Sequence, residues 1–301
     1  MVLLFLAVAG MSWANDFKTL PGQHMLIHFT DKDSGNARIA RQTLGQYYHE
    51  LVFDLQLQVP DTIQVYIIPT RGMFRDIIRG RLPEWTGAFA TPGDNAMYLK
   101  SPTWDRENDF KTTLVHELLH LLLHKKMGNI EIPRWLDEGL AIFYSQDQRW
   151  ITSTALSKAL TTRSVIHLAD IDRVLNFHRT KAELAYQESW SAVQYLLATY
   201  DIDALQIILN NLQQRHSLDQ AFRQATGSPF QEFEREWIRY AKKKYEWIWL
   251  YELDNYVWIL IIILFIAAFI LIRFRNHKKI KEWEEEPLPD PEDTGPETEA
   301  E

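Results

Sequence analysis

Two histidines one helical turn apart, His116 and His120, flank a glutamate in the run Val-His-Glu-Leu-Leu-His. Side chains at positions i and i+4 lie on one face of a helix, so both imidazoles can bind a single Zn²⁺ ion. Glu117 stands beside the first histidine, where its carboxylate can take a proton from the attacking water. These residue types at this spacing indicate the site of a zinc hydrolase.

A second acidic centre, Asp137-Glu138, follows further along the chain and offers a third ligand. Adjacent residues point about 100° apart on a helix, so only one of the two carboxylates can face the ion. Gly139 and the apolar residues around it favour Glu138 as a buried ligand. Three protein ligands leave a fourth position for water or substrate, which distinguishes a catalytic zinc site from a structural one. The alternative is that both carboxylates are solvated charges on a helix face.

The elements that position these residues follow from the spacing of apolar side chains. From Phe110 to Lys126 the leucines recur at helical spacing, Asn108 or Asp109 can cap the start, and Gly128 ends the segment. The alternative for this helix is a pair of core histidines with Glu117 in a buried ion pair. A carboxylate buried among leucines without a partner would cost free energy, which favours the metal site.

With these motifs in place, the chain resembles the gluzincin metallopeptidases, and within them the small bacterial domains described as peptidase-MA-like. The resemblance covers about residues 24 to 243. The segments that carry it are HELLH at 116–120, PRWLDEGLA at 133–141, AYQESW at 185–190 and EREW at 234–237. The first two segments are specific and the last two are loose patterns.

This likeness implies that His116, His120 and Glu138 bind zinc and that Glu117 is the general base of peptide hydrolysis. Many gluzincins have an acidic residue one turn beyond the third ligand, and it orients one of the histidines. This chain has Ile142 at that position, so the orienting partner must come from elsewhere.

Peptide hydrolysis also needs a hydrogen-bond donor for the oxyanion, and two residues are candidates. Tyr186 is the first, because the family likeness puts it at the head of a helix across the cleft, and His178 is the second. Either residue could instead serve only in packing. His124 continues the histidine row but lies too far along the helix axis from His116 to share its ion. We expect it at the surface or behind the ligands.

The predicted fold class is α+β, with a small mixed sheet and the zinc helix followed by an α-helical half. The sheet edge beside the zinc helix holds extended substrate in gluzincins, and by analogy we expect substrate against Ala96 to Ser101. The expected strands are 25–29, 62–68 and a hairpin of 87–90 with 96–99. The expected helices are 37–55, 73–78, 189–199, 204–213, 217–225 and 228–245.

Composition narrows the chemistry further. The 301 residues carry a formal net charge of −8, which gives no sign of nucleic-acid binding. There are no cysteines, so disulfides and thiolate ligands are excluded and histidines and carboxylates remain as the zinc ligands.

Two apolar segments indicate targeting. Residues 1–14 resemble a secretory signal peptide that lacks the usual basic start, although a buried N-terminal strand is an alternative. Tyr256 to Ile272 is uncharged and has aromatic residues before it and basic residues after it, as in a transmembrane helix whose C-terminal side is cytoplasmic. A buried core helix is the weaker alternative.

We therefore expect residues 15–245 to form the catalytic domain, 246–272 the membrane-proximal segment and anchor, and 273–301 a basic, then acidic, disordered tail. The function predicted is a single-pass zinc metallopeptidase of a bacterial inner membrane, with an extracytoplasmic catalytic domain and a peptide or protein substrate. Two alternatives remain open. One is a catalytically silent scaffold that binds envelope proteins, and the other is a zinc hydrolase that acts on a cell-wall amide.

Overall fold

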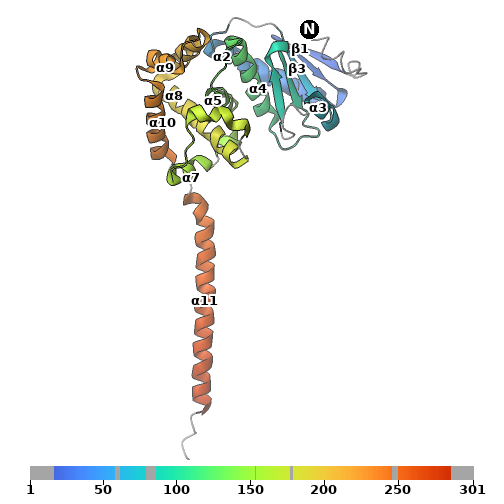
Figure 1. Ribbon diagram of the computed structural model, residues 1–301. Coiled ribbons are helices and arrows are strands. Elements are labelled where there is room, and N and C mark those ends of the chain that lie inside the picture. Colours follow the sequence, from blue (N-terminus) through green and yellow to red (C-terminus); the bar gives the residue numbers. More distant parts are fainter. Residues whose placement is uncertain are drawn as a thin grey trace, which may run out of the picture. The chain divides into compact units, whose positions relative to one another are not determined.

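The structure, a computed structural model, describes residues 17–57, 62–78, 86–152, 154–176, 179–245 and 250–285. The chain divides into two compact units, Met1–Glu246 and Trp247–Glu301. In the first unit a sheet lies beside a group of helices, and the second contains one long helix (Figure 1). The predicted signal peptide, residues 1–14, lies outside the described residues.

A five-stranded mixed sheet forms one half of the first unit. Its strands are β1 (Lys18–Gly22), β2 (Met25–Phe29), β3 (Ile63–Ile68), β4 (Ala88–Thr91) and β5 (Ala96–Lys100), in the order β1-β2-β3-β5-β4. β2, β3 and β5 run parallel, whereas β1 and β4 pair antiparallel at the two edges. The sequence predicted every strand except β1, whose residues KTLPG include proline and glycine and lack an apolar alternation.

The sheet order corrects the prediction that Ala96 to Ser101 forms the edge that holds substrate. β5 pairs with β3 on one side and with β4 on the other, so both rows of its backbone groups are already used. The hairpin was predicted from local turn residues, but these do not reveal which of its strands will pair with β3. Among the described strands, the edge on this side is β4, which also contacts the helix that carries the two histidines, Phe110–Met127.

Two helices hold the sheet to the rest of the unit. α2 (Ser34–Asp54) packs on β1 and β2, and α4 (Phe110–Met127) packs on β4 and β5 as well as on α2. Alternate residues of β2 are buried, as expected for a strand with one face in the core. α3 (Arg71–Ile78) forms a separate small cluster with Ile68, which follows the buried Ile67 and therefore points to the opposite face of the sheet.

The other half of the first unit is helical. Its elements are α5 (Arg134–Ser145), α6 (Gln148–Ile151), α7 (Ala155–Thr162), η4 (Leu168–Asn176), α8 (Arg179–Gln213), α9 (Leu218–Thr226) and α10 (Phe230–Tyr245). The backbone at Asp201 is not helical, which divides α8 about where two helices were predicted. The first part of α8 begins at Arg179, well before the predicted start at residue 189. A capping box of Ser217 and Gln220 begins α9, which was predicted as a helix from residue 217.

The buried side of α8 includes polar residues that accept hydrogen bonds from the backbone of a neighbouring segment. The Gln187 side chain accepts a hydrogen bond from the backbone N–H of Leu156 at 2.7 Å, and Glu188 accepts one from Ile166 N–H at 3.0 Å. Both side chains are buried. They satisfy backbone groups of the segment around α7, which would otherwise be buried without partners.

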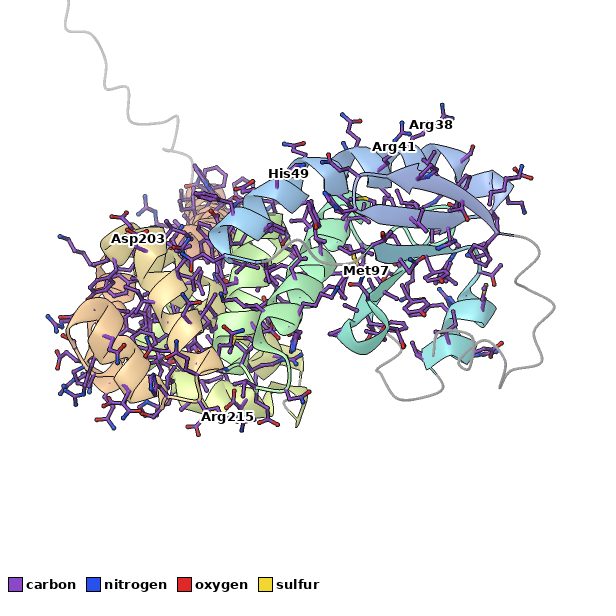
Figure 2. All side chains as sticks on the ribbon, turned by 90° about the horizontal axis from the view of Figure 1, so that it is seen from above. Arg38, Arg41, His49, Met97, Asp203 and Arg215 are labelled. Carbon is purple, nitrogen blue, oxygen red and sulfur yellow. The ribbon has the colours of Figure 1, made fainter. Side chains whose placement is uncertain are left out.

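A network of amides joins the two halves where the end of α2 meets the second part of α8. Gln56 donates to the Gln206 side chain at 2.6 Å, and Gln206 donates to the backbone oxygen of Asp54 at 3.1 Å. A groove opens at the surface here, with His49 of α2 and Asp203 of α8 among its lining residues (Figure 2). This contact fixes the helical half against the helix that lies on the sheet.

The second unit is described by one helix, α11 (Leu250–Glu285). Among the described residues, its stretch Val257–His277 is the one helix long and apolar enough to cross a membrane, judged by length and composition. α11 continues past the predicted end of the anchor at residue 272 and is helical as far as Glu285, within the segment expected to be a disordered tail. Residues 286–301 lie outside the described part.

Candidate metal centre

α4 carries the first two predicted ligands. Asp109 caps its start by accepting a hydrogen bond from Thr112 N–H at 2.7 Å, and Gly128 ends it with a φ of 63°. On the face between these ends, the Nε2 atoms of His116 and His120 lie 3.1 Å apart. The i, i+4 spacing therefore brings the two imidazoles together as predicted.

The third predicted ligand comes from α5, which packs against α4. Glu138 Oε2 lies 3.6 Å from His116 Nε2 and 3.6 Å from His120 Nε2. Neighbouring ligands of a tetrahedral zinc ion, each about 2.0–2.1 Å from the metal, lie about 3.3 Å from one another. Two imidazole nitrogens and one carboxylate oxygen at these separations fit a single ion of that kind.

Asp137 contacts the histidines of the centre in a way that the sequence did not assign. Its Oδ1 lies 2.7 Å from Nδ1 of His120, and its Oδ2 lies 3.2 Å from Nε2 of His124. The carboxylate thus contacts the Nδ1 side of the His120 ring and leaves Nε2 directed at His116 and Glu138. The partner that orients His120 is therefore Asp137, the residue just before the predicted third ligand, and not residue 142. Adjacent residues diverge by about 100° on a helix, so Asp137 can face His120 Nδ1 while Glu138 faces the two Nε2 atoms.

A sequence signal for this contact existed in the histidine row. His120 and His124 are themselves spaced i, i+4, so one carboxylate facing that row can reach both rings. His124 lies behind the ligands, which agrees with its expected exclusion from the ion that His116 would bind.

The electrostatics of the centre favour a cation. Burial alone would lower the pKa of His120, but the carboxylates of Asp137 and Glu138 raise the pKa well above its ordinary value. Burial raises the pKa of Glu117, and the nearby imidazoles of His116 and His120 oppose that rise. A carboxylate whose pKa is raised is a stronger base than an ordinary one, which suits a proton acceptor.

Tyr186 reaches the centre from α8, although it lies in the interior of this helix and not at its head. Burial raises the pKa of Tyr186, the charge of Glu138 raises it further, and Arg134 opposes the rise through its charge and a side-chain hydrogen bond. The Trp150 ring lies against the Tyr186 ring, with centroids 4.7 Å apart. The tyrosine hydroxyl is therefore held among the charged groups of the centre. His178, the second candidate, lies outside the described residues.

Arg134 is a further residue that sequence reasoning missed. It begins α5, and its Nη2 lies 2.7 Å from Glu138 Oε1. Burial would lower the pKa of Arg134, but Glu138, Asp137 and Tyr186 raise it, so the guanidinium stays charged. The i, i+4 spacing of Arg134 and Glu138 was visible in the sequence, but such pairs are usually surface contacts.

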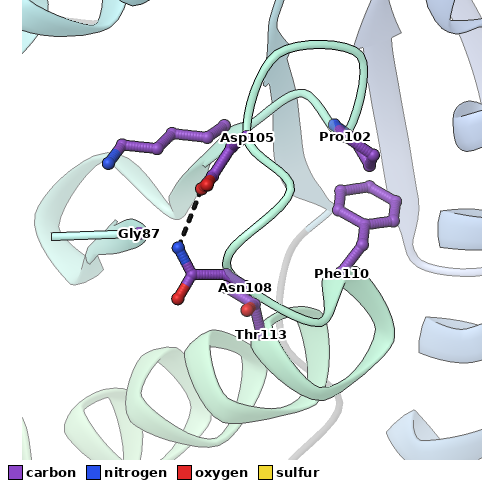
Figure 3. Close-up of a pocket in the computed structure, with 7 residues that line it drawn as sticks. Gly87, Pro102, Asp105, Asn108, Phe110 and Thr113 are labelled. Atoms are coloured by element: carbon purple, nitrogen blue, oxygen red, sulfur yellow. Dashed lines mark hydrogen bonds between the residues drawn. The ribbon is translucent and has the colours of Figure 1, made fainter. Parts of the chain in front are cut away.

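A small pocket near the start of α4 is separate from this centre. It is lined by residues of the loop before α4 and of the neighbouring strands, among them Gly87, Asp105 and Asn108, and by none of the predicted ligands (Figure 3). Asn108 donates to Asp105 at 2.8 Å, and Arg149 of α6 donates to Asn108 at 2.6 Å. These contacts tie the helical half to the loop that leads into α4.

Comparison with known proteins places most of the first unit in one family. A family model described as the Peptidase MA superfamily matches residues 44–243, which include both acidic centres and all the helices from α3 to α9. No curated protein matches the chain.

Proposed function

The chain belongs to the Peptidase MA superfamily, and on that premise we propose that it is a membrane-anchored, zinc-dependent metallopeptidase. Its predicted ligands are His116, His120 and Glu138, and its predicted general base is Glu117. The observation that carries this proposal is the convergence of two imidazole nitrogens and one carboxylate oxygen, 3.1–3.6 Å apart, from two separate helices.

The donor set supports zinc in particular. Imidazole nitrogen and carboxylate oxygen are common zinc ligands, and three of them leave a position for reaction. Bound there, zinc would polarise the scissile carbonyl and lower the pKa of the attacking water.

The protein's own residues supply the proton transfers. Glu117 would accept the proton of the attacking water and deliver it to the leaving amine, and burial, which raises the pKa of its carboxyl group, would favour that proton transfer. The Tyr186 hydroxyl, whose raised pKa keeps it protonated, would donate a hydrogen bond to the developing oxyanion. Asp137 would keep the His120 ring in the orientation and tautomer that ligation needs.

The open edge of the sheet supports a peptide substrate. Among the described strands, β4 is at the edge and pairs with β5 alone, and it contacts α4, which carries the two histidines. An extended peptide could add to this edge by main-chain hydrogen bonds and pass the centre. We therefore propose that substrate contacts Ala88–Thr91, and not Ala96–Ser101.

The proposed location follows from α11. A helix of this length and composition can anchor the chain in a bilayer. The basic residues Arg273 and Arg275 come after the apolar stretch, which favours a cytoplasmic C-terminal side and an extracytoplasmic catalytic unit.

The test uses the full chain in detergent micelles, with quenched fluorescent peptide libraries and isolated cell-wall fragments as substrates. Glu117→Gln should retain stoichiometric zinc and lose at least about 100-fold in turnover, because the proton acceptor is gone. Glu107→Gln removes the same charge at an exposed site and should leave zinc and turnover unchanged.

The outcomes separate the alternatives. Chelator-sensitive cleavage of peptides supports the peptidase, and cleavage of cell-wall fragments alone would support a hydrolase of non-peptide amides. Zinc binding without any turnover would support a silent scaffold. A purified chain that binds no zinc would end the proposal altogether.

A further inference from the structure

Arg134 forms an unusual version of a common helical ion pair. Its guanidinium contacts Glu138 one turn later, with a relative exposure of 35% for the arginine side chain and 6% for the glutamate. Arg223 and Asp219 make a pair of the same sequence separation on α9, but there the exposures are 57% and 48%. A pair at the surface contributes little, whereas one shielded from water holds its geometry strongly.

The contact divides the two oxygens of the Glu138 carboxylate. Oε1 lies 2.7 Å from Arg134 Nη2, and Oε2 faces the two imidazoles at 3.6 Å. This ion pair on one oxygen favours one orientation of the carboxylate about its last bond. One oxygen, and not two, is thereby presented to the position between His116 and His120.

Arg134 is itself held at its backbone. Its N–H donates to Asp172 Oδ1 at 2.8 Å, and the carbonyl of the preceding Pro133 accepts from Leu136 N–H at 2.9 Å. The start of α5 is thus fixed to η4 as well as to its own first turn. The guanidinium projects from an anchored point and not from a freely moving helix end.

The guanidinium also forms a hydrogen bond with the Tyr186 side chain. Arginine has only donors, so in its hydrogen bond with Tyr186 the phenol oxygen accepts. The hydroxyl hydrogen then remains available to another acceptor. The Trp150 ring against Tyr186 limits the movement of the phenol from the other side.

We propose that Arg134 is a positioning residue that holds Glu138 with a single oxygen toward the metal and holds Tyr186 with its hydroxyl hydrogen directed to the substrate. This inference rests on the proposed zinc peptidase function. Arg134 would align both the third ligand and the oxyanion donor, because the planar guanidinium can contact two groups at fixed angles.

The experiment replaces zinc by Co²⁺ in the full chain in detergent micelles, because Co²⁺ reports its ligand geometry through visible absorption. Arg134→Met removes the charge and keeps most of the side-chain volume. We expect Co²⁺ affinity to fall about 10- to 100-fold and the visible spectrum to change, as when a partner of a ligand is lost. Arg223→Met is the matched control and should leave both unchanged.

Arg134→Lys separates the two contacts. A lysine can still offer one charge to Glu138 but cannot reproduce the fork, so Co²⁺ affinity should recover to near the wild-type value while kcat on peptides stays reduced. This variant also decides the matter if Arg134→Met fails to fold, which loss of its thermal unfolding transition would reveal.

Wild-type affinity, spectrum and kcat in either Arg134 variant would overturn the inference and leave the proposed function intact. If the wild-type chain itself binds no Co²⁺ or Zn²⁺, the proposed function fails and the inference fails with it. The two failures are therefore distinguishable from the behaviour of the wild-type protein.

Discussion

The substitution Gly139→Ala tests whether close packing of α5 on α8 builds the metal centre. A Cβ atom on residue 139 would lie 2.4 Å from the backbone oxygen of Ser189 and 2.7 Å from Val193 Cγ2. Glu138 directly precedes this glycine, and Tyr186 lies one turn before Ser189. The contact therefore fixes the spacing between the chain positions that carry a ligand and the proposed oxyanion donor.

The magnitude follows from the distances. An ordinary van der Waals contact needs about 3.5 Å, so α5 and α8 would have to separate by about 1 Å. The obstacle is backbone and not a flexible side-chain end, so we place the overpacking cost near 3 kcal/mol, the upper part of the usual range. Alanine regains about 1 kcal/mol of helix propensity, which leaves a net loss of about 2 kcal/mol.

The assay is urea unfolding of the full chain in micelles, followed by tryptophan fluorescence, together with zinc content and turnover. A displacement of about 1 Å at a catalytic group can cost about 100-fold in rate, so turnover should fall by about that factor. Gly45→Ala is the matched control. Residue 45 is inside α2 with open space around it, so this variant should gain up to about 1 kcal/mol and keep its turnover.

The packing argument would be refuted by a Gly139→Ala variant at least as stable as the wild type with unchanged turnover. A variant that lost stability but retained full turnover would show that the helix contact supports the fold without aligning the centre.

Three further predictions follow from the buried charges and the anchor. Asp137→Asn should lower zinc affinity about 10- to 100-fold in a chelator competition, since His120 loses its charged partner, and equal affinity would contradict that role. Burial raises the pKa of Glu188 well above its ordinary value, so the folded chain keeps a proton that the unfolded chain releases as pH rises, and stability falls. Glu188→Gln should therefore unfold at a higher temperature than the wild type at pH 8 and at nearly the same temperature at pH 4. The gain in the free energy of unfolding at pH 8 is about 1.4 kcal/mol for each unit by which the Glu188 pKa is raised. An equal difference between the two proteins at pH 4 and pH 8 would exclude a titrating Glu188. A chain that ends at Glu246 should stay soluble without detergent, and continued membrane extraction would show that α11 is not the sole anchor.

The local elements of this protein could be predicted from short stretches of sequence. The helix of His116 and His120, its Asp109 cap and its Gly128 end depend on neighbouring residues, and all three are seen in the structure. Gly139 and its apolar neighbours also indicated a buried position for Glu138, and that side chain is buried. These features depend on backbone geometry within one or two turns, which the sequence specifies directly.

Other features depend on pairings between distant segments. The edge position of β4 is decided when β3 pairs with β5, and nothing inside the hairpin encodes that choice. The start of α8 at Arg179 was missed because its buried side carries Gln187 and Glu188, whose partners are backbone groups around α7.

The sequence by itself determined that two histidines share a helix face, that a glutamate stands beside them and that a second acidic centre follows on another helix. Only the tertiary structure decided that Glu138 faces both imidazoles, that Asp137 turns to His120, and that Arg134 bridges toward Tyr186. The reason is physical: spacing along one helix fixes which side chains share a face, whereas the packing of α5 between α4 and α8 fixes which faces meet.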